Sequence, residues 1–457
     1  MSRASTTDLD WTAAGQNGAQ RASLTVPVDH AAAHGAEIDL SVVRYPATEP
    51  ENRIGVLVVL PDDPGSPGVP FTGQVAGALP ESLTRRFDVV GFDHRFSGDS
   101  VPLRWGLDQR EIFWVFHHPD SFPAEVRFQA EIAAKAAAHS LETLPHISTR
   151  AIARDVDLLR RALGEERINL LGHNYGSYLG AVYGEMFGDH AGRVVLDSVL
   201  SPDWVWRDLF VNFADNCEAA LAAWCAGSAG GALGPDAGAV RAAFDDVLRK
   251  AGAGGLMLGG VPLPLDGRLF RVLTMMLLSS RRSHPALADV VRCARTGEVL
   301  SAATQQLLGA LFAAPRGAET AAAQLAILCG DAAWPRSIEF YESAYEAATG
   351  FMGPALCGIK AGAFWPVQPA EPPTSFGPAK AEGVLLVQAE HDMFTTAAGA
   401  ARLRELLGEG TRSVLVGNMA EHRVFPFAGD ERVNSLVAEF LITGRLPESD
   451  VRLDDRE

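Results

Sequence analysis

The order of apolar and polar residues in the middle of the chain predicts a strand, a helix and a second strand. Apolar runs predict short buried strands over 167–171 and over 193–199. Between them, the small residues of 178–183 allow a helix to pack closely against the sheet. Another helix is predicted over 149–163, where apolar residues recur at helical spacing. These elements form a βαβ unit, so we expect a parallel sheet with a ligand site at the carboxyl ends of its strands.

Later apolar runs extend the sheet and set the expected domain organisation. Further strands are predicted over 383–388 and 412–416, far along the chain from the βαβ unit. We therefore expect a core made of residues 1–203 and 370–457. Residues 204–369 are expected to be inserted between the two parts of the core as a mainly helical lid.

The expected lid opens on an aromatic-rich segment that contains Trp204 and Trp206. A single aromatic residue is more typical of a packed core than of a binding site. Several in a lid above an apolar cleft are typical of a pocket for a sizeable organic substrate, so both tryptophans are expected substrate contacts. Glycine-rich stretches over 227–238 and 252–260 predict loops within the lid.

The turn of the βαβ unit, Gly172-His-Asn-Tyr-Gly176, has the spacing of the G-x-S-x-G turn that exposes a nucleophilic serine. Its central residue is Asn174, whose amide cannot be deprotonated at neutral pH to attack a carbonyl. The position normally requires a positive φ, which asparagine tolerates well, so the residue can be purely structural. Alternatively, the Asn174 amide donates a hydrogen bond to a substrate carbonyl or enolate. Tyr175, the next residue, is an expected substrate contact.

This turn, with the stretches 155–164 and 193–197, closely resembles the tripeptidyl aminopeptidase and proline iminopeptidase branch of the α/β-hydrolases. The resemblance runs from about Trp11 to about Pro447 and includes the segment 87–95. It implies an α/β fold in which helices flank a mostly parallel central sheet and a helical lid is inserted.

The same resemblance assigns the other two members of a catalytic triad. Asp392 follows the strand over 383–388, where the family has its acid, and Glu390 is a nearby substitute. His422 follows the strand over 412–416, at the position of the family histidine. The chain order Asn174, Asp392, His422 is that of nucleophile, acid and base. A retained pair would hold a neutral imidazole ready to accept a proton, whereas the alternative is a His422 that only fills its former place.

The loop expected to stabilise an oxyanion also departs from the family pattern. Relatives have a glycine pair whose backbone N–H groups face the developing negative charge, whereas this chain has Asp62 and Asp63. A carboxylate about 4 Å from an oxyanion costs up to roughly 4 kcal/mol at an effective dielectric near 20, which opposes hydrolysis. A carboxylate facing the cleft would be a second acid or base, whereas one facing solvent would only stiffen the loop. Loss of the serine together with the glycine pair favours divergence from hydrolysis over a single inactivating substitution.

Composition and charge argue against some classes of function. The formal net charge of −17 argues against a nucleic-acid surface, because phosphate contacts need clustered lysine and arginine. No apolar stretch reaches the length of a membrane span and the first residues lack a signal-peptide core, so we expect a cytoplasmic protein without membrane association. The five cysteines include pairs resembling family disulfides, Cys217 with Cys225 and Cys329 with Cys357. Reduced thiols are the expectation in that compartment. No cofactor and no metal site are expected, and the oligomeric state stays open.

The sequence thus favours a non-hydrolytic enzyme that acts on a small molecule by general acid/base catalysis. The expected reaction is cyclisation or carbon–carbon bond formation on a polyketide-like intermediate. One alternative is a serine-hydrolase-type aminopeptidase or esterase that is inactivated or uses water activated by His422. Acidic residues of one lid helix, Glu339, Glu342 and Glu346, would then bind a peptide amino terminus, although a solvated face is their simpler interpretation. The other alternative is a binding protein without catalytic activity.

Overall fold

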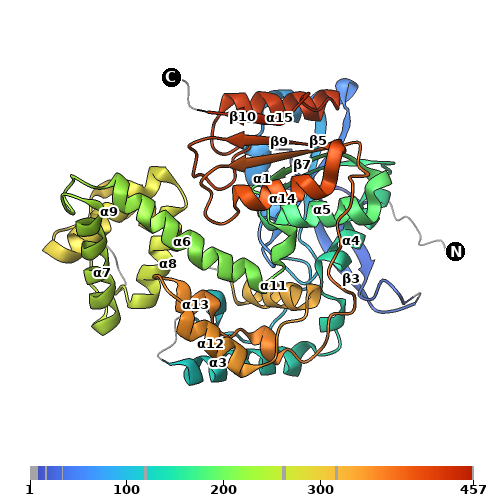
Figure 1. Cartoon of the computed structure of the whole chain (residues 1–457). Coiled ribbons are helices and arrows are strands. Elements are labelled where there is room, and N and C mark those ends of the chain that lie inside the picture. The colour runs from blue at the N-terminus through green and yellow to red at the C-terminus, as the bar shows by residue number, and fades with distance from the viewer. Residues whose placement is uncertain are drawn as a thin grey trace.

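The computed structural model describes residues 9–15, 18–32, 34–117, 121–259, 264–313 and 317–454. Within these ranges the centre of the molecule is a ten-stranded sheet of order β1-β2-β3-β5-β4-β6-β7-β8-β9-β10 (Figure 1). Its strands are β1 (Thr12–Ala13), β2 (Gln20–Pro27), β3 (Glu37–Tyr45), β4 (Gly55–Val59), β5 (Phe87–Phe92), β6 (Ile168–His173), β7 (Ala191–Asp197), β8 (Gly383–Ala389), β9 (Thr411–Val416) and β10 (Val451–Leu453).

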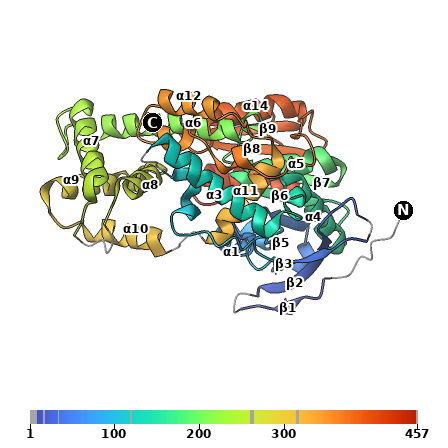
Figure 2. The ribbon, with the colours of Figure 1, turned by 90° about the horizontal axis from the view of Figure 1, so that it is seen from below.

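Most of the sheet is parallel. Pairing is parallel from β5 through β4, β6, β7, β8 and β9 to β10, whereas β1, β2, β3 and β5 pair antiparallel. The antiparallel strands form one edge of the molecule when it is seen from below (Figure 2). This arrangement confirms the expected α/β fold, and it brings the carboxyl ends of β4, β6, β7, β8 and β9 to one edge.

Both faces of the sheet are buried. Alternate residues of β4 enter two separate core clusters: Val56 and Val58 enter one, and Leu57 and Val59 enter the other. This alternation is the two-residue period of a strand. Apolar residues of α4, α5 and α14 belong to the first cluster, and those of α1 and α15 belong to the second. Helices therefore cover the sheet on both sides.

The core helices are α1 (Gly68–Ala78), α2 (Glu81–Thr84), α4 (Thr149–Ala162), α5 (Tyr175–Phe187), α14 (Ala397–Leu407) and α15 (Glu431–Thr443). The predicted helix over 149–163 is α4, whose residues Ile152, Val156 and Leu159 are fully or almost fully buried. Ser148 caps it by accepting the N–H of Ala151. The four strands predicted from apolar runs correspond to β6, β7, β8 and β9, with ends displaced by at most two residues.

The remaining α-helices of the described ranges are α3 (Phe122–Ser140), α6 (Arg207–Gly227), α7 (Ala237–Gly254), α8 (Gly267–Leu278), α9 (His284–Thr296), α10 (Ala302–Ala313), α11 (Ala318–Asp331), α12 (Ile338–Ala347) and α13 (Gly353–Cys357). All except α3 lie between β7 and β8 in the chain. Figure 1 shows α6 leading away from the sheet toward α7, α8 and α9. Helix α3 packs against α12 and the short helix η7 (Ala361–Phe364), so the helical layer also uses residues before β6. The domain bounds at 203 and 370 stay a prediction.

One predicted loop boundary within the insertion is wrong, whereas the described residues 255–259 are outside any helix, as predicted. Gly252 and Gly254 belong to the last turn of α7, whereas a glycine-rich loop was expected from residue 252 onward. The helix continues because its buried face, which includes Val247 and Ala251, still packs against the core. Packing here outweighs the low helix propensity of glycine, which costs about 1 kcal/mol per residue.

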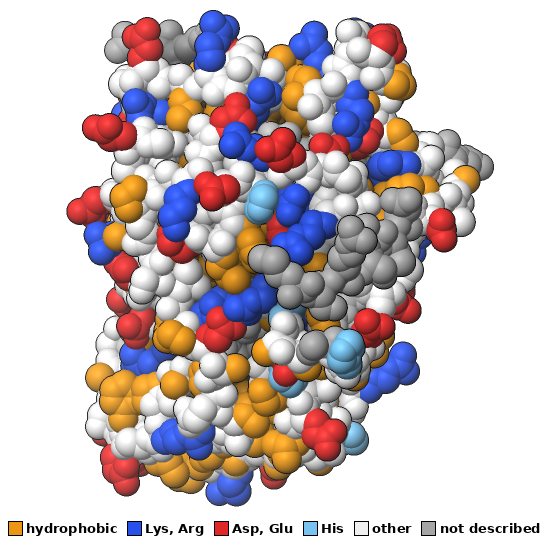
Figure 3. Space-filling view, turned by 90° about the vertical axis from the view of Figure 1, so that its right-hand side faces the viewer, with side chains coloured by type: hydrophobic (Ala, Val, Ile, Leu, Met, Phe, Trp, Pro, Cys, Tyr) orange, Lys and Arg blue, Asp and Glu red, His pale blue; other side chains and the backbone are white. Residues whose placement is uncertain are grey.

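All five cysteines lie in the described part of the chain, and each is a free thiol. No helix in the described ranges is long and apolar enough to cross a membrane. Acidic and basic side chains are interspersed on the face drawn in Figure 3.

Candidate active site

The nucleophile turn has the sharp geometry that its sequence predicts. Asn174 lies between β6 and α5 with φ 49° and ψ −116°. A positive φ is uncommon outside glycine, and asparagine is one of the residues that adopt it most often. A Cβ on Gly172 would come within 2.2 Å of the Gly176 carbonyl oxygen, and one on Gly176 would lie 2.9 Å from the Pro61 carbonyl oxygen. The two glycines therefore let strand, helix and neighbouring loop approach closely around Asn174.

The acid–base pair is assembled. Nδ1 of His422 lies 2.8 Å from Oδ2 of Asp392, and the Asp392 carboxylate also accepts the hydroxyl of Thr395 at 2.6 Å and the N–H of Phe394 at 2.9 Å. Burial lowers the pKa of His422, but the charge and hydrogen bond of Asp392 outweigh burial and raise that pKa above its usual value. Within the described chain Nε2 of His422 makes no hydrogen bond, so it is available for proton transfer.

Glu390, the substitute acid, lies elsewhere. Its carboxylate accepts the backbone N–H of Asn418 and pairs with Arg452, and it makes no contact with His422. Asp392 is therefore the partner of the histidine.

The backbone group that normally binds an oxyanion is occupied. In this fold the N–H of the residue after the nucleophile supplies one oxyanion donor. Here that N–H, of Tyr175, donates to the backbone carbonyl of Asp62 at 2.9 Å. Nδ2 of Asn174 donates to Oδ1 of Asp63 at 2.7 Å. The loop that replaces the glycine pair thus binds both the turn backbone and the Asn174 side chain.

Of the two aspartates, Asp62 faces inward and Asp63 outward. The Asp62 side chain is only 15% exposed, and its Oδ2 lies 3.3 Å from a guanidinium nitrogen of Arg423. Its Oδ1 is buried without a hydrogen-bond partner. Burial, with a smaller contribution from Asp63, raises the pKa of Asp62 to about 7, against the opposing charges of Arg423 and His422. Such a carboxyl can gain or lose a proton near neutral pH.

Two residues that sequence reasoning missed hold the segment after His422. Asp197, at the end of β7, accepts the N–H groups of Val424 and Phe425 at 2.9 and 2.6 Å. Nε2 of His173 lies 2.6 Å from the Phe425 carbonyl oxygen. A buried acid at the carboxyl end of a central strand is the sequence signal that could have identified Asp197. Arg423, the residue directly after His422, was also not identified from the sequence and carries no such signal.

The aromatic residues expected to contact substrate have other partners. The Tyr175 side chain is fully buried and its hydroxyl lies 3.0 Å from the Thr149 hydroxyl. Trp206 is 2% exposed, packs edge-on against Tyr178 and donates its indole N–H to Asp331. Both side chains belong to the core, and no contact of theirs supports the expected role. Trp204 is half-buried in a short helix before α6.

The acidic residues of α12 lie on a solvated face. Glu339, Glu342 and Glu346 are all exposed. This placement agrees with the simpler interpretation of these residues, a charged helix surface.

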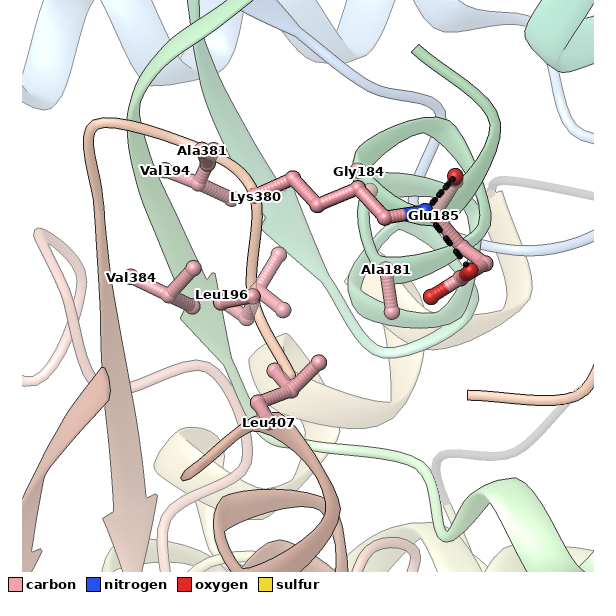
Figure 4. Close-up of a pocket in the computed structure, with 11 residues that line it drawn as sticks. Ala181, Gly184, Glu185, Val194, Leu196, Lys380, Ala381, Val384 and Leu407 are labelled. Carbon is pink, nitrogen blue, oxygen red and sulfur yellow. Dashed lines mark hydrogen bonds and ion pairs between the residues drawn. The ribbon is translucent and has the colours of Figure 1, made fainter. Parts of the chain in front are cut away.

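Two hollows lie apart from the acid–base pair. A cavity of about 20 Å³ is lined by α5, β7, β8 and the loop before β8, with Lys380 and Glu185 paired beside it (Figure 4). It is lined mainly by small and apolar side chains and is too small for an organic substrate. A groove of about 550 Å³ lies between the loop after α6 and α9. Neither hollow is lined by Asn174, Asp392 or His422.

Strand, turn, helix and acid–base pair together define an α/β-hydrolase. The family model "alpha/beta hydrolase fold" matches residues 64–223, and the model "TAP-like protein" matches residues 353–452. The tripeptidyl aminopeptidase of Streptomyces lividans is 32% identical over 459 residues, which cover 94% of this chain and 82% of the relative. The chain therefore belongs to the tripeptidyl aminopeptidase-like branch of the α/β-hydrolases.

Other similar proteins carry hydrolase names. Carboxylesterase B of Mycobacterium tuberculosis is 28% identical, with 95% of this chain and 86% of the relative covered. The solved structure of proline iminopeptidase from Mycobacterium smegmatis is 14% identical, with a TM-score of 0.44 and coverage of 92% of this chain and 97% of that one.

Proposed function

We propose that this protein is an enzyme that transfers protons through His422 and Asp392 and forms no acyl-enzyme intermediate. The observation that carries the proposal is the combination of an intact His422–Asp392 pair with an asparagine at the nucleophile position. In a serine hydrolase, loss of the nucleophile lowers turnover by about 10⁶-fold. The pair that would have activated the serine nevertheless keeps its hydrogen bond and its free Nε2.

The surrounding contacts support a non-covalent role. The Tyr175 N–H is bound to the Asp62 carbonyl, so a tetrahedral oxyanion has no free donor at that position. Asn174 uses one amide hydrogen for Asp63, and an amide has two. The second hydrogen can be donated to a substrate carbonyl, where it would stabilise an enolate formed by His422.

Proton abstraction next to a carbonyl followed by ring closure or carbon–carbon bond formation is the reaction that we propose. Assignment of a polyketide-like intermediate rests on the loss of the nucleophile and on a composition rich in alanine, glycine and arginine, typical of a GC-rich bacterial genome. The relatives give this narrower assignment no support, because they are named as peptidases and esterases.

Those names favour a second candidate, hydrolysis by a water molecule that His422 activates directly. This reaction uses the same base and needs no serine, but it forms the oxyanion for which the Tyr175 N–H is not free. A role in binding alone is disfavoured, because binding does not require His422 and Asp392 to stay aligned at 2.8 Å.

Exchange of the acidic α-protons of a ketone for deuterium distinguishes between these candidates. With 2-tetralone in deuterium oxide, NMR should show α-proton exchange that the wild type accelerates and the His422→Gln variant does not. A fluorophosphonate probe should leave the protein unlabelled, and an alanyl nitroanilide should not be cleaved. Stoichiometric labelling, or cleavage that depends on His422, would establish a hydrolase instead. Absence of exchange would refute proton transfer to this class of substrate.

A further inference from the structure

Arg423, the residue directly after His422, has a guanidinium group at the edge of the candidate site. Its side chain is 38% exposed and lies over the rings of Phe71 and Phe427, 6.0 and 5.9 Å from their centres. The nearest carboxylate oxygen is Oδ2 of Asp62, at 3.3 Å. Among the described residues the guanidinium makes no hydrogen bond, so its donors remain available at the edge of the site.

The backbone fixes Arg423 in an uncommon conformation. Its φ is 65°, a left-handed value that is rare for a long side chain. The Arg423 N–H donates to the Ser198 hydroxyl at 2.8 Å, and the next two N–H groups are held by Asp197. The backbone at Arg423 is therefore fixed by hydrogen bonds to Asp197 and Ser198, and the guanidinium is positioned by the rings of Phe71 and Phe427. A donor that is oriented in advance loses less entropy when it binds a ligand.

Asp62 complements Arg423. Its Oδ1 is buried and lacks a partner, so a proton on this carboxyl would have no acceptor until a ligand supplies one. Burial and the neighbouring Asp63 raise the pKa of Asp62 to about 7, although Arg423 and His422 lower it. Asp197 also faces this carboxyl and raises its pKa. Near neutral pH Asp62 therefore carries a proton in a substantial fraction of molecules.

These groups match the chemistry of a carboxylate. A guanidinium donates two parallel N–H bonds to the two oxygens of a carboxylate. A protonated carboxyl adds a third donor to the same group. An ammonium group offers no acceptor to Arg423 or to protonated Asp62, and Arg423 would repel it.

We propose that Arg423 and the carboxyl of Asp62 bind a carboxylate group of the substrate beside Nε2 of His422. The inference rests on the proposed function, and it names the substrate as an organic acid. The negative charges of Asp63 and Asp392 do not prevent binding, because Asn174 binds Asp63 and His422 binds Asp392. A carboxylate at Arg423 would displace the weak contact with Asp62.

Binding should therefore be coupled to uptake of a proton. When Asp62 is ionised, its charge repels the incoming carboxylate, and when it is protonated it donates a hydrogen bond. Affinity for a carboxylate should fall as pH rises through about 7, approaching tenfold per pH unit above that value.

Calorimetry with three probes of similar shape tests the site. Phenylacetate should bind the wild type, and phenylacetamide and phenethylamine should bind at least tenfold more weakly. Arg423→Gln should abolish phenylacetate binding. Arg423→Lys, which keeps the charge, should weaken binding severalfold because it loses the paired donors. Asp62→Asn should keep binding, and its affinity should fall less steeply with rising pH than that of the wild type, since only His422 still titrates beside the ligand. Arg402→Gln, on the exposed face of α14, is the matched control and should bind as the wild type does.

Each alternative result is informative. Equal binding of phenylacetate by Arg423→Gln, tighter binding of the amine, or no binding of the acid by the wild type would overturn the carboxylate site. If Arg423→Gln fails to fold, the Asp62→Asn pH profile still decides the question. Wild-type protein that binds phenylacetate but exchanges no ketone protons would refute proton transfer and leave the carboxylate site intact. Exchange without phenylacetate binding would refute only the carboxylate site.

Discussion

The backbone carbonyl of Asp62 accepts the N–H of Tyr175 at 2.9 Å, which occupies an oxyanion donor of the α/β-hydrolase turn. The contact is made by the loop that carries two aspartates in place of the glycine pair of relatives. A side-chain substitution at Asn174 therefore does not free the Tyr175 N–H, because the group that occupies it is a backbone carbonyl of a separate loop.

Restoring the serine alone should consequently fail to restore hydrolysis. We expect Asn174→Ser to gain little activity on p-nitrophenyl acetate. Adding Asp62→Gly and Asp63→Gly should raise that activity by about 10²-fold, the value of one oxyanion donor. Steady-state rates and fluorophosphonate labelling measure both effects.

The matched control for that series is Asn174→Ala with both glycine substitutions, which has the open loop but no nucleophile and should stay inactive. Vigorous hydrolysis by Asn174→Ser on its own would show that the loop does not obstruct the site, and the inactivated-hydrolase alternative would then be preferred.

A second prediction concerns the ionisation of His422. Asp392 raises the pKa of His422, so Asp392→Asn should lower it, and ring NMR signals followed against pH measure the change. A histidine whose pKa is raised by folding stabilises the folded state. This contribution is present in full below the pKa of the unfolded state, about 6.5, and is lost as the pH rises through the folded pKa. The stability of the variant should therefore fall most below pH 6.5. Ketone exchange should fall by about 10²–10⁴-fold, because the imidazole loses its orienting partner.

Glu390→Gln is the control for this measurement, since Glu390 binds Asn418 and Arg452 instead of the histidine. An unchanged His422 pKa in Asp392→Asn would mean that the 2.8 Å contact does not control ionisation.

Much of the fold could be predicted from local sequence patterns, and the acid–base pair could be predicted from the resemblance to the α/β-hydrolase family. Buried runs such as Ile168–His173 form strands, and the order Asn174, Asp392, His422 follows from strands whose carboxyl ends meet at one edge. Whether a given side chain lies in the core or in a pocket could not be predicted in the same way. Trp206 looks like a pocket residue in sequence, yet the packing of Tyr178 and the acceptor Asp331 hold it in the core.

The backbone contacts of the site were also beyond sequence reasoning. Whether the Asp62 carbonyl or its side chain approaches the turn depends on loop dihedral angles that tertiary packing sets. The same holds for the positive φ of Arg423, whose N–H binds the Ser198 hydroxyl and whose next two N–H groups bind Asp197 at the end of β7.

A third prediction concerns Asp62 and stability. Its folded pKa of about 7 lies above the unfolded value near 3.9, so the folded state holds its proton more tightly. Stability should fall as pH rises from about 4 to about 7, and the cost should be complete above pH 7. Asp62→Asn removes this cost. We expect it to stabilise the protein at pH 8 by on the order of 2 kcal/mol in urea unfolding, allowing for the lost contact with Arg423.

The stability gained by Asp62→Asn should decrease toward pH 4, where residue 62 is uncharged in the folded state of both the wild type and the variant. Asp63→Asn serves as the comparison, because Asp63 is exposed and a surface change typically stays within about 0.5 kcal/mol. A gain that does not vary with pH would contradict the assigned ionisation of Asp62.

A last prediction concerns Asp331, at the end of α11, which joins the lid to the core. Its buried carboxylate accepts the N–H and hydroxyl of Thr149 at 2.7 and 2.6 Å and the indole N–H of Trp206 at 3.0 Å. Asp331→Ala leaves these donors buried without an acceptor, so we expect a loss of about 3–5 kcal/mol in urea unfolding. Trp206→Phe removes one donor and leaves the carboxylate with Thr149, and it should cost about 1 kcal/mol for that bond plus a smaller packing loss. If Asp331→Ala cost no more than Trp206→Phe, the carboxylate would not be the group that holds the lid to α4.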